Sequence, residues 1–249
     1  EIGSGLVGSE MCIRDSIWTK PVMNLAKVRN TGFELAATYR NKIGDLSYSV
    51  SGNIATNNNE IVTLAGSDNM IQNGGDVVRY ILKEGEAIGS YYGLETDGLY
   101  TQEEIDAGHY YKYGRKPNAG DIKYVPQREN VEWGDDITDD DRTIIGKDVP
   151  DFTYGININL QWKNFDLNLD FAGAAMQSWN QNYELRNAFH ANGNSPAYLL
   201  EDRWHRADPY NPNSEWISGY YPAIRYNTSS NNGKTSDFWI HDVRFLRLK

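Results

Sequence analysis

The sequence predicts an all-β fold, namely a fragment of an antiparallel transmembrane β-barrel with about five strands and two long extracellular loops. Apolar and polar residues alternate strictly through 152–171, which is the period of strands that have two unlike faces. The apolar residues are also sorted along each strand, with aromatic rings at the ends and aliphatic side chains between them. Aromatic rings prefer the two water–lipid boundaries, so this order is typical of a strand that crosses a membrane.

Two hairpins and a final strand carry this pattern. The expected strands occupy 32–40, 46–56, 151–162, 165–174 and 238–249. The first hairpin turns near Gly44 and the second at Lys163-Asn164. A strand of about eleven residues at ~3.3 Å each, tilted by about 45°, covers roughly 25 Å of membrane normal, the height of the apolar band of a barrel. We therefore expect the apolar faces to contact outer-membrane lipid and the polar faces to line the lumen.

Two very long connections, 57–150 and 176–237, separate these strands. Connections of this length are rare in compact soluble domains, whereas outer-membrane barrels join short periplasmic turns to long extracellular loops. Because both hairpin turns are short, both long segments are expected on the same, extracellular side. We also expect local strand structure within the first loop, around 88–100.

Composition excludes several function classes. The net charge of −10 and the pI of about 4.9 argue against a nucleic-acid partner. No run of apolar residues is long enough for a transmembrane helix. The four histidines and the single cysteine, Cys12, have no metal-ligand spacing, and we find no motif for a catalytic nucleophile. No enzymatic activity is therefore predicted.

The two ends of the chain stand apart from the pattern. Residues 1–16 are interpreted as a sequencing artefact or a disordered end, because the string 9–16 resembles translated adapter sequence. On this interpretation Cys12 is not part of the natural protein, and 17–249 form the partial barrel. The chain begins without Met or a signal peptide, and it stops inside an alternating run, so we interpret it as a fragment.

Several short motifs follow one another along the chain. They are Asn30-Thr31-Gly32-Phe33-Glu34-Leu35, Ile88-Gly89-Ser90-Tyr91-Tyr92-Gly93, Thr96-Asp97-Gly98-Leu99-Tyr100, Ala119-Gly120-Asp121-Ile122-Lys123-Tyr124, Asp139-Asp140-Asp141-Arg142, Pro150-Asp151-Phe152-Thr153-Tyr154-Gly155, Asp202-Arg203-Trp204 and Phe245-Leu246-Arg247-Leu248-Lys249. In this order they resemble the SusC/RagA-like TonB-dependent outer-membrane transporters, and the resemblance covers nearly everything from residue 28 onward.

This resemblance implies a bacterial outer-membrane location and energy-coupled uptake of a glycan or peptide nutrient. It also implies two partners: a SusD-like surface lipoprotein that closes over the loops, and the TonB complex, which acts through a plug region outside this chain. Family members often carry a calcium-loop-like motif before the Asp-Asp-Arg segment, and 127–136 lacks that spacing here. Asp135, Asp139 and Asp141 are weak candidates for a calcium-like cation, and the alternative is a solvated acidic turn.

Aromatic residues gather in the second long loop amid Asn, Ser and Arg. The candidate ligand-binding residues are Trp179, Tyr183, Trp204, Tyr210, Trp216, Tyr220 and Tyr221. Exposed rings can stack on sugars, with amides and carboxylates around them as hydrogen-bonding groups. The same rings could instead pack the loop together or meet a partner protein.

A competing class is a secreted β-sandwich that binds or hydrolyses carbohydrate. It requires the apolar faces of the two hairpins to pack against each other in a dry core. A passive porin-like channel is a third possibility, which differs from the transporter in having no plug.

Overall fold

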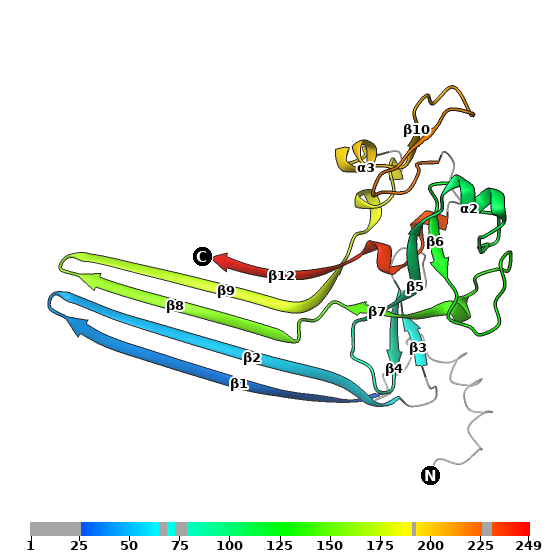
Figure 1. The fold of residues 1–249 in the computed structure, drawn as a ribbon. Coiled ribbons are helices and arrows are strands. Elements are labelled where there is room, and N and C mark those ends of the chain that lie inside the picture. The colour runs from blue at the N-terminus through cyan, green and yellow to red at the C-terminus, as the bar shows by residue number, and fades with distance from the viewer. Residues whose placement is uncertain (1–25, 65–68, 73–78, 191–192, 226–230) are drawn as a thin grey trace, which may run out of the picture.

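The computed structural model describes residues 26–64, 69–72, 79–190, 193–225 and 231–249. The interpretation of 1–16 concerns residues outside these ranges. Figure 1 shows one long sheet that projects from a more irregular part of the chain. We call this irregular part the cap and define it as the described residues of 69–147 and 181–239, which include strands β3 to β7 and helix α2.

The projecting sheet contains five strands that neighbour each other in the order β1-β2-β8-β9-β12. Their bounds are β1 (Ala26–Ile43), β2 (Leu46–Leu64), β8 (Phe152–Trp162), β9 (Phe165–Asn180) and β12 (Ile240–Leu248). All four pairings are antiparallel, which confirms the predicted all-β, antiparallel class. Strands β1, β2 and β9 extend beyond the expected bounds toward the cap, because backbone pairing continues where apolar alternation stops. As a result Trp179, expected in the second loop, lies in β9.

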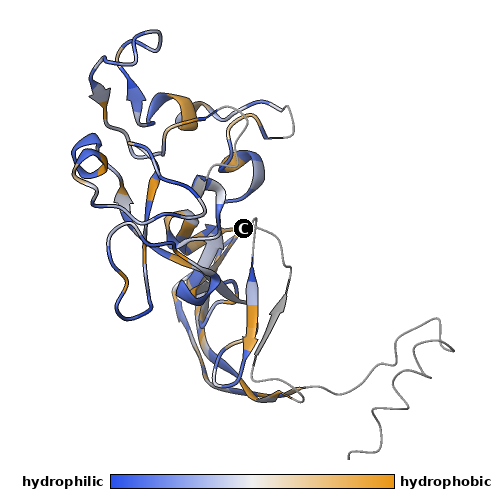
Figure 2. Ribbon diagram, turned by 90° about the vertical axis from the view of Figure 1, so that its right-hand side faces the viewer, coloured by the Kyte–Doolittle hydropathy of each residue, from blue (hydrophilic) through white to orange (hydrophobic). Residues whose placement is uncertain are grey.

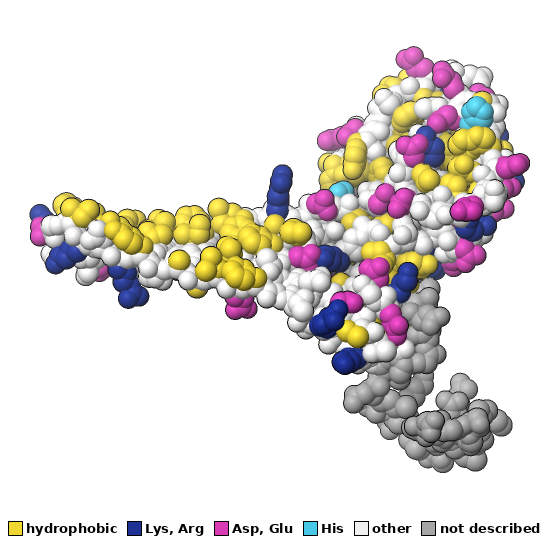
Figure 3. All heavy atoms as spheres, turned by 60° about the horizontal axis from the view of Figure 1, so that its bottom comes forward, with side chains coloured by type: hydrophobic (Ala, Val, Ile, Leu, Met, Phe, Trp, Pro, Cys, Tyr) yellow, Lys and Arg dark blue, Asp and Glu magenta, His cyan; other side chains and the backbone are white. Residues whose placement is uncertain are grey.

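The register of the sheet places the apolar residues of four strands on one face. Near the turns, Ile43 pairs with Leu46, Leu46 with Trp162, and Trp162 with Phe165. At the cap end the same face reaches Phe33 of β1. Beyond Phe33 this face of β1 becomes polar, with Thr31, Arg29 and Lys27. The apolar band therefore has the ~25 Å height of a bilayer core, and the sheet continues past it. Figure 3 shows hydrophobic side chains along this sheet.

The sandwich alternative is wrong, because the two hairpins do not face each other. Strand β2 pairs edge to edge with β8 over 46–56, so the hairpins lie side by side in one sheet. Their apolar side chains remain accessible: Ile156 is 40% exposed and Leu167 is 49% exposed. Among the described helices, none is both long enough and apolar enough to span a bilayer.

The cap contains the shorter elements. They are β3 (Asn69–Gln72), β4 (Tyr80–Lys83), β5 (Ser90–Leu99), α2 (Gln102–Ala107), β6 (Ile122–Val125), β7 (Arg142–Lys147), α3 (Ala197–Glu201), β10 (His205–Arg206) and β11 (Trp216–Ile217). Strand β5 confirms the expected strand structure around 88–100 and pairs with β4, β6 and β7. Helix α2 begins at a capping box formed by Thr101 and Glu104 and ends at the left-handed Gly108. In Figure 2 the apolar segments of the cap are dispersed among polar loops.

The buried core of the cap draws on both long connections. Its members are Leu94, Ile122, Tyr124, Ile137, Leu199 and Trp239. The first four come from the first connection, Leu199 comes from the second, and Trp239 directly follows the second. The backbone N–H of Leu94 donates to the carbonyl oxygen of Thr235 at 3.0 Å, which ties β5 to the second connection. The two connections therefore fold as one unit.

Candidate functional site

The two connections meet at a buried aspartate, Asp121, in the turn before β6. This residue is only 4% exposed. Its Oδ1 accepts hydrogen bonds from Arg225 Nε at 2.8 Å and from Asn232 Nδ2 at 3.1 Å. Its Oδ2 accepts the backbone N–H of Asn118 at 2.8 Å. A buried carboxylate needs such partners, so Asp121 joins residues that are more than a hundred positions apart in the sequence.

The neighbouring Gly120 allows the second connection to approach closely. Its φ of +80° is a left-handed conformation, and an added Cβ would lie 2.5 Å from Cδ1 of Trp204 and 2.9 Å from Cβ of Ala223. The carbonyl oxygen of Gly120 accepts the backbone N–H of Ala223 at 2.8 Å. Only glycine satisfies both the conformation and the contact.

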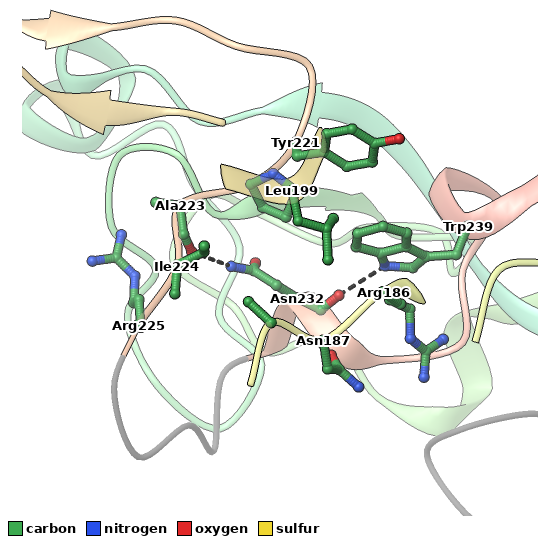
Figure 4. A pocket seen from close by; sticks show the side chains of 11 residues that line it. Arg186, Asn187, Leu199, Tyr221, Ala223, Ile224, Arg225, Asn232 and Trp239 are labelled. Atoms are coloured by element: carbon green, nitrogen blue, oxygen red, sulfur yellow. Dashed lines mark hydrogen bonds between the residues drawn. The ribbon is translucent and has the colours of Figure 1, made fainter. Parts of the chain in front are cut away.

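A small cavity of about 50 Å³ lies beside this junction (Figure 4). Asn232 closes one side: its Nδ2 donates to the carbonyl oxygen of Ala223, and its own carbonyl oxygen accepts Nε1 of Trp239 at 2.8 Å. In this view Arg186 and Arg225 lie on opposite sides of Asn232. This volume has room for a few water molecules but not for a sugar or a peptide residue.

A row of aromatic side chains lies beside the cavity. Tyr221 is central: its ring centroid is 5.2 Å from that of Tyr198, 4.9 Å from Tyr220 and 6.1 Å from Trp239. Phe238 extends the row, with its centroid 5.5 Å from that of Tyr220. Sequence reasoning chose Tyr220 and Tyr221 but missed Phe238 and Trp239. These two residues directly follow the second connection, and the expected last strand, 238–249, included them.

The other candidate residues lie apart from this row. Trp179 stacks on His241 within the sheet, with 6.0 Å between ring centroids. Tyr183 is exposed and contacts His190. Tyr210 is 94% exposed at the tip between β10 and β11. The structure therefore does not gather the seven rings into one surface.

Trp204 and Trp216 have contacts that hold the cap together. The ring of Trp204 packs on Gly120. Trp216 donates from Nε1 to Oε1 of Gln102 at 3.0 Å, and the guanidinium of Arg206 lies 4.1 Å from its ring centroid. Together these contacts attach the β10–β11 hairpin to α2 and to the turn at Gly120.

The three acidic candidates for a cation each bind other protein groups. Asp141 accepts hydrogen bonds from Arg128 Nε at 2.9 Å and from the backbone N–H of Thr138 at 2.8 Å. Burial opposes its ionisation, but hydrogen bonds from Arg128 and from backbone amides outweigh this and lower the pKa of Asp141. A hydrogen bond from Arg142 lowers the pKa of Asp139. Asp135 closes a turn by accepting the backbone N–H of Glu132.

Among the residues that the structure describes, no group of three or more His, Cys, Asp or Glu side chains is placed to hold a metal ion. The acidic segment instead stabilises its own loop through arginine and backbone donors.

The polar face of the projecting sheet carries side-chain hydrogen bonds between neighbouring strands. Thr38 donates to Ser51 at 3.1 Å between β1 and β2, and Asn159 donates to Ser49 at 3.3 Å between β8 and β2. Asn157 donates to Asn168 at 3.0 Å between β8 and β9. This face is therefore suited to water, whereas the opposite face is suited to lipid.

Comparison with known proteins supports the same class. No family model matches the chain. The chain is 30% identical to TonB-dependent receptor P3 of Formosa agariphila over 234 residues, which are 92% of this chain and 22% of that protein. It is 28% identical to TonB-dependent receptor P26 of the same organism over 204 residues, or 78% of this chain and 19% of that protein. The chain thus spans about a fifth of the length of these curated relatives.

Solved structures show the same fold. The chain matches the structure of the RagAB peptide transporter with a TM-score of 0.61 and 20% identity, covering 91% of this chain and 22% of that one. It matches the RagAB peptide importer in the closed-closed state with a TM-score of 0.60 and the same identity and coverage. The projecting sheet is therefore a stretch of transmembrane barrel wall that is not closed within this chain. By sequence, the chain belongs to the TonB-dependent receptors, of which it is a segment, and its fold is that of the RagAB structures.

Proposed function

We propose that the chain forms part of the wall and the extracellular mouth of an outer-membrane transporter that imports a nutrient, either a glycan or a peptide. The observation that carries the proposal is the bilayer-high apolar band on one face of the sheet, with a hydrogen-bonded polar face behind it. The polar face would line the path of the nutrient. The relatives are TonB-dependent receptors and the matching structures are of a peptide transporter, which supports import in general.

The cap would stand outside the cell, at the entrance to the barrel. Its two connections are joined through Asp121, so it would form a fixed rim rather than two independent loops. The exposed rings of Tyr183, Tyr210 and Tyr220 are the candidates for contact with the nutrient or with a partner. Trp204, Trp216 and Tyr221 would support them from within, and Trp179 would do so from the edge of the sheet.

We further propose the partners expected for such a transporter. A SusD-like surface lipoprotein would close over the cap, and the TonB complex would act through a plug formed by other parts of the receptor. Uptake that requires TonB distinguishes this function from that of a passive channel. If cells without TonB take up the nutrient at an unchanged rate through the receptor, the channel alternative holds instead.

The assignment of the two faces is tested by cysteine labelling in intact cells, with Cys12 replaced by serine. The two cysteines of Ile158→Cys and Asn159→Cys occupy adjacent positions of β8 and lie on opposite faces of the sheet. We expect a membrane-impermeant maleimide to label Asn159→Cys from the water-filled lumen and to leave Ile158→Cys unlabelled. The third variant, Tyr210→Cys, should be labelled without permeabilisation. Equal labelling at 158 and 159, or labelling at 210 only after permeabilisation, would contradict the proposal.

A further inference from the structure

A second set of stacked aromatic rings lies in the first connection. It consists of His109, Tyr111 and Trp133, and we call it the aromatic platform. The ring centroid of Trp133 is 4.6 Å from that of Tyr111, with 27° between the planes, and 5.6 Å from that of His109, with 33° between the planes. Tyr111 packs on the core of the cap. His109 is exposed, and Trp133 remains 53% exposed despite both contacts.

The backbone beneath the platform is held by several hydrogen bonds. Gly134 N–H donates to the carbonyl oxygen of Tyr110 at 2.7 Å, and Lys112 N–H donates to that of Asp135 at 2.8 Å. Tyr111 N–H donates to the hydroxyl of Tyr100 at 2.9 Å. The backbone N–H of Glu132 donates a hydrogen bond to Oδ2 of Asp135, which closes the turn. These bonds do not involve the indole of Trp133, so the turn does not require a large ring there.

The charges around the platform nearly cancel. The segments 106–116 and 128–136 together contain five acidic and four basic residues, although the whole chain has a net charge of −10. A ligand that carries a strong charge of either sign would therefore gain little from this surface. A neutral sugar ring presents C–H groups that can lie on the electron-rich face of an aromatic ring, and hydroxyls that can bond to groups at its edge. Exposed Glu132, next to Trp133, is an acceptor for such hydroxyls.

We infer that the aromatic platform of His109, Tyr111 and Trp133 is a binding site for a neutral glycan on the outer surface of the receptor. The inference rests on the proposed function, because it takes the cap to face the cell exterior, and it names the class of nutrient. The rings are already stacked and held in place, so binding does not require them to be ordered first. The site would hold a glycan chain beside the barrel mouth.

The test measures binding directly, on the purified receptor in detergent micelles, by isothermal titration. The probes are cellohexaose, laminarihexaose and mannohexaose as neutral glycans, hexagalacturonate as an anionic glycan, and a lysine-containing hexapeptide. We expect at least one neutral glycan to bind and Trp133→Ala to weaken it by about fivefold to tenfold. Trp133→Phe keeps a stacking ring and should retain most of the affinity.

The matched control is Phe189→Ala, which removes a ring that is 56% exposed, close to the 53% of Trp133, but for which the structure shows no stacking partner among the described residues. It should leave the affinity unchanged. Protection of the Gly134 amide from hydrogen exchange verifies that each variant keeps the turn. The inference is overturned if no neutral glycan binds, if the peptide or the anionic glycan binds more tightly, or if Trp133→Ala binds as well as the parent. It is also overturned if Phe189→Ala loses affinity equally. Uptake is scored separately, so glycan binding without TonB-dependent uptake would refute the proposed function and leave this site standing.

Discussion

Replacing Asp121 by alanine should open the cap while leaving the projecting sheet intact. The carboxylate accepts three hydrogen bonds, and one of its partners is the guanidinium of Arg225. Removing one member of a buried ion pair leaves the other charge without compensation, and the loss is about 3–5 kcal/mol. Asp121→Asn keeps the size but loses the charge, so we expect a smaller loss of about 1.5–3 kcal/mol.

Hydrogen exchange followed by mass spectrometry on the receptor in micelles measures this loss. The reporter amides are Tyr100, which donates to the carbonyl oxygen of Asp121, and Ala223, which donates to that of Gly120. Their exchange in Asp121→Ala should be faster by roughly two to four orders of magnitude, as the free energy above implies. Amides of the β8–β9 ladder should keep their protection.

The matched control for this prediction is Asp97→Ala. The Asp97 carboxylate also faces a cation, Lys123 Nζ at 3.1 Å, but its side chain is 75% exposed. A surface ion pair of this kind contributes about 0–1 kcal/mol. If Asp121→Ala accelerates exchange in the cap no more than Asp97→Ala does, the claim that Asp121 joins the two connections is refuted.

Three further predictions follow from the same contacts. Gly120→Ala should destabilise the cap by about 1–3 kcal/mol, because a Cβ would overlap the contacts of Gly120 with the second connection, and the same exchange experiment measures it. Ile158→Arg should cost about 2–4 kcal/mol of barrel stability in a urea titration in lipid, whereas Asn159→Arg on the polar face should cost little, and equal losses would contradict the two faces. Because the folded-state pKa of Asp141 is lowered, its contribution to stability is present above its usual pKa and is lost as pH falls; Asp141→Asn should therefore flatten the acid limb of a stability profile below that usual pKa.

Much of the sheet could be predicted from the sequence, because successive side chains of a strand point to opposite faces of the sheet. Alternation over 152–171 assigned both strands of the second hairpin, and the turn at Lys163-Asn164 follows from where the alternation breaks. The ends of β1 and β2 nearest the cap could not be predicted from alternation. They lie beyond the lipid band, where neither face needs to be apolar, and only backbone pairing reveals them.

The candidate site was harder to predict for a related reason. Aromatic composition identified Tyr220 and Tyr221 but could not show that their neighbours are Phe238 and Trp239. Composition also made Trp204 and Tyr210 equal candidates for ligand binding. In the structure the ring of Trp204 packs on Gly120, whereas the ring of Tyr210 is exposed to solvent. Exposure depends on which distant segment covers a ring, and composition carries no information on that.

The sequence by itself determined that these strands have one face for lipid and one for water, because that property needs only a period of two residues. Only the tertiary structure decided that β2 pairs with β8 across the long first connection, and that Asp121 binds Arg225 from the second. Both contacts join segments about a hundred residues apart, and the free energy that selects them comes from burial and pairing in the folded chain.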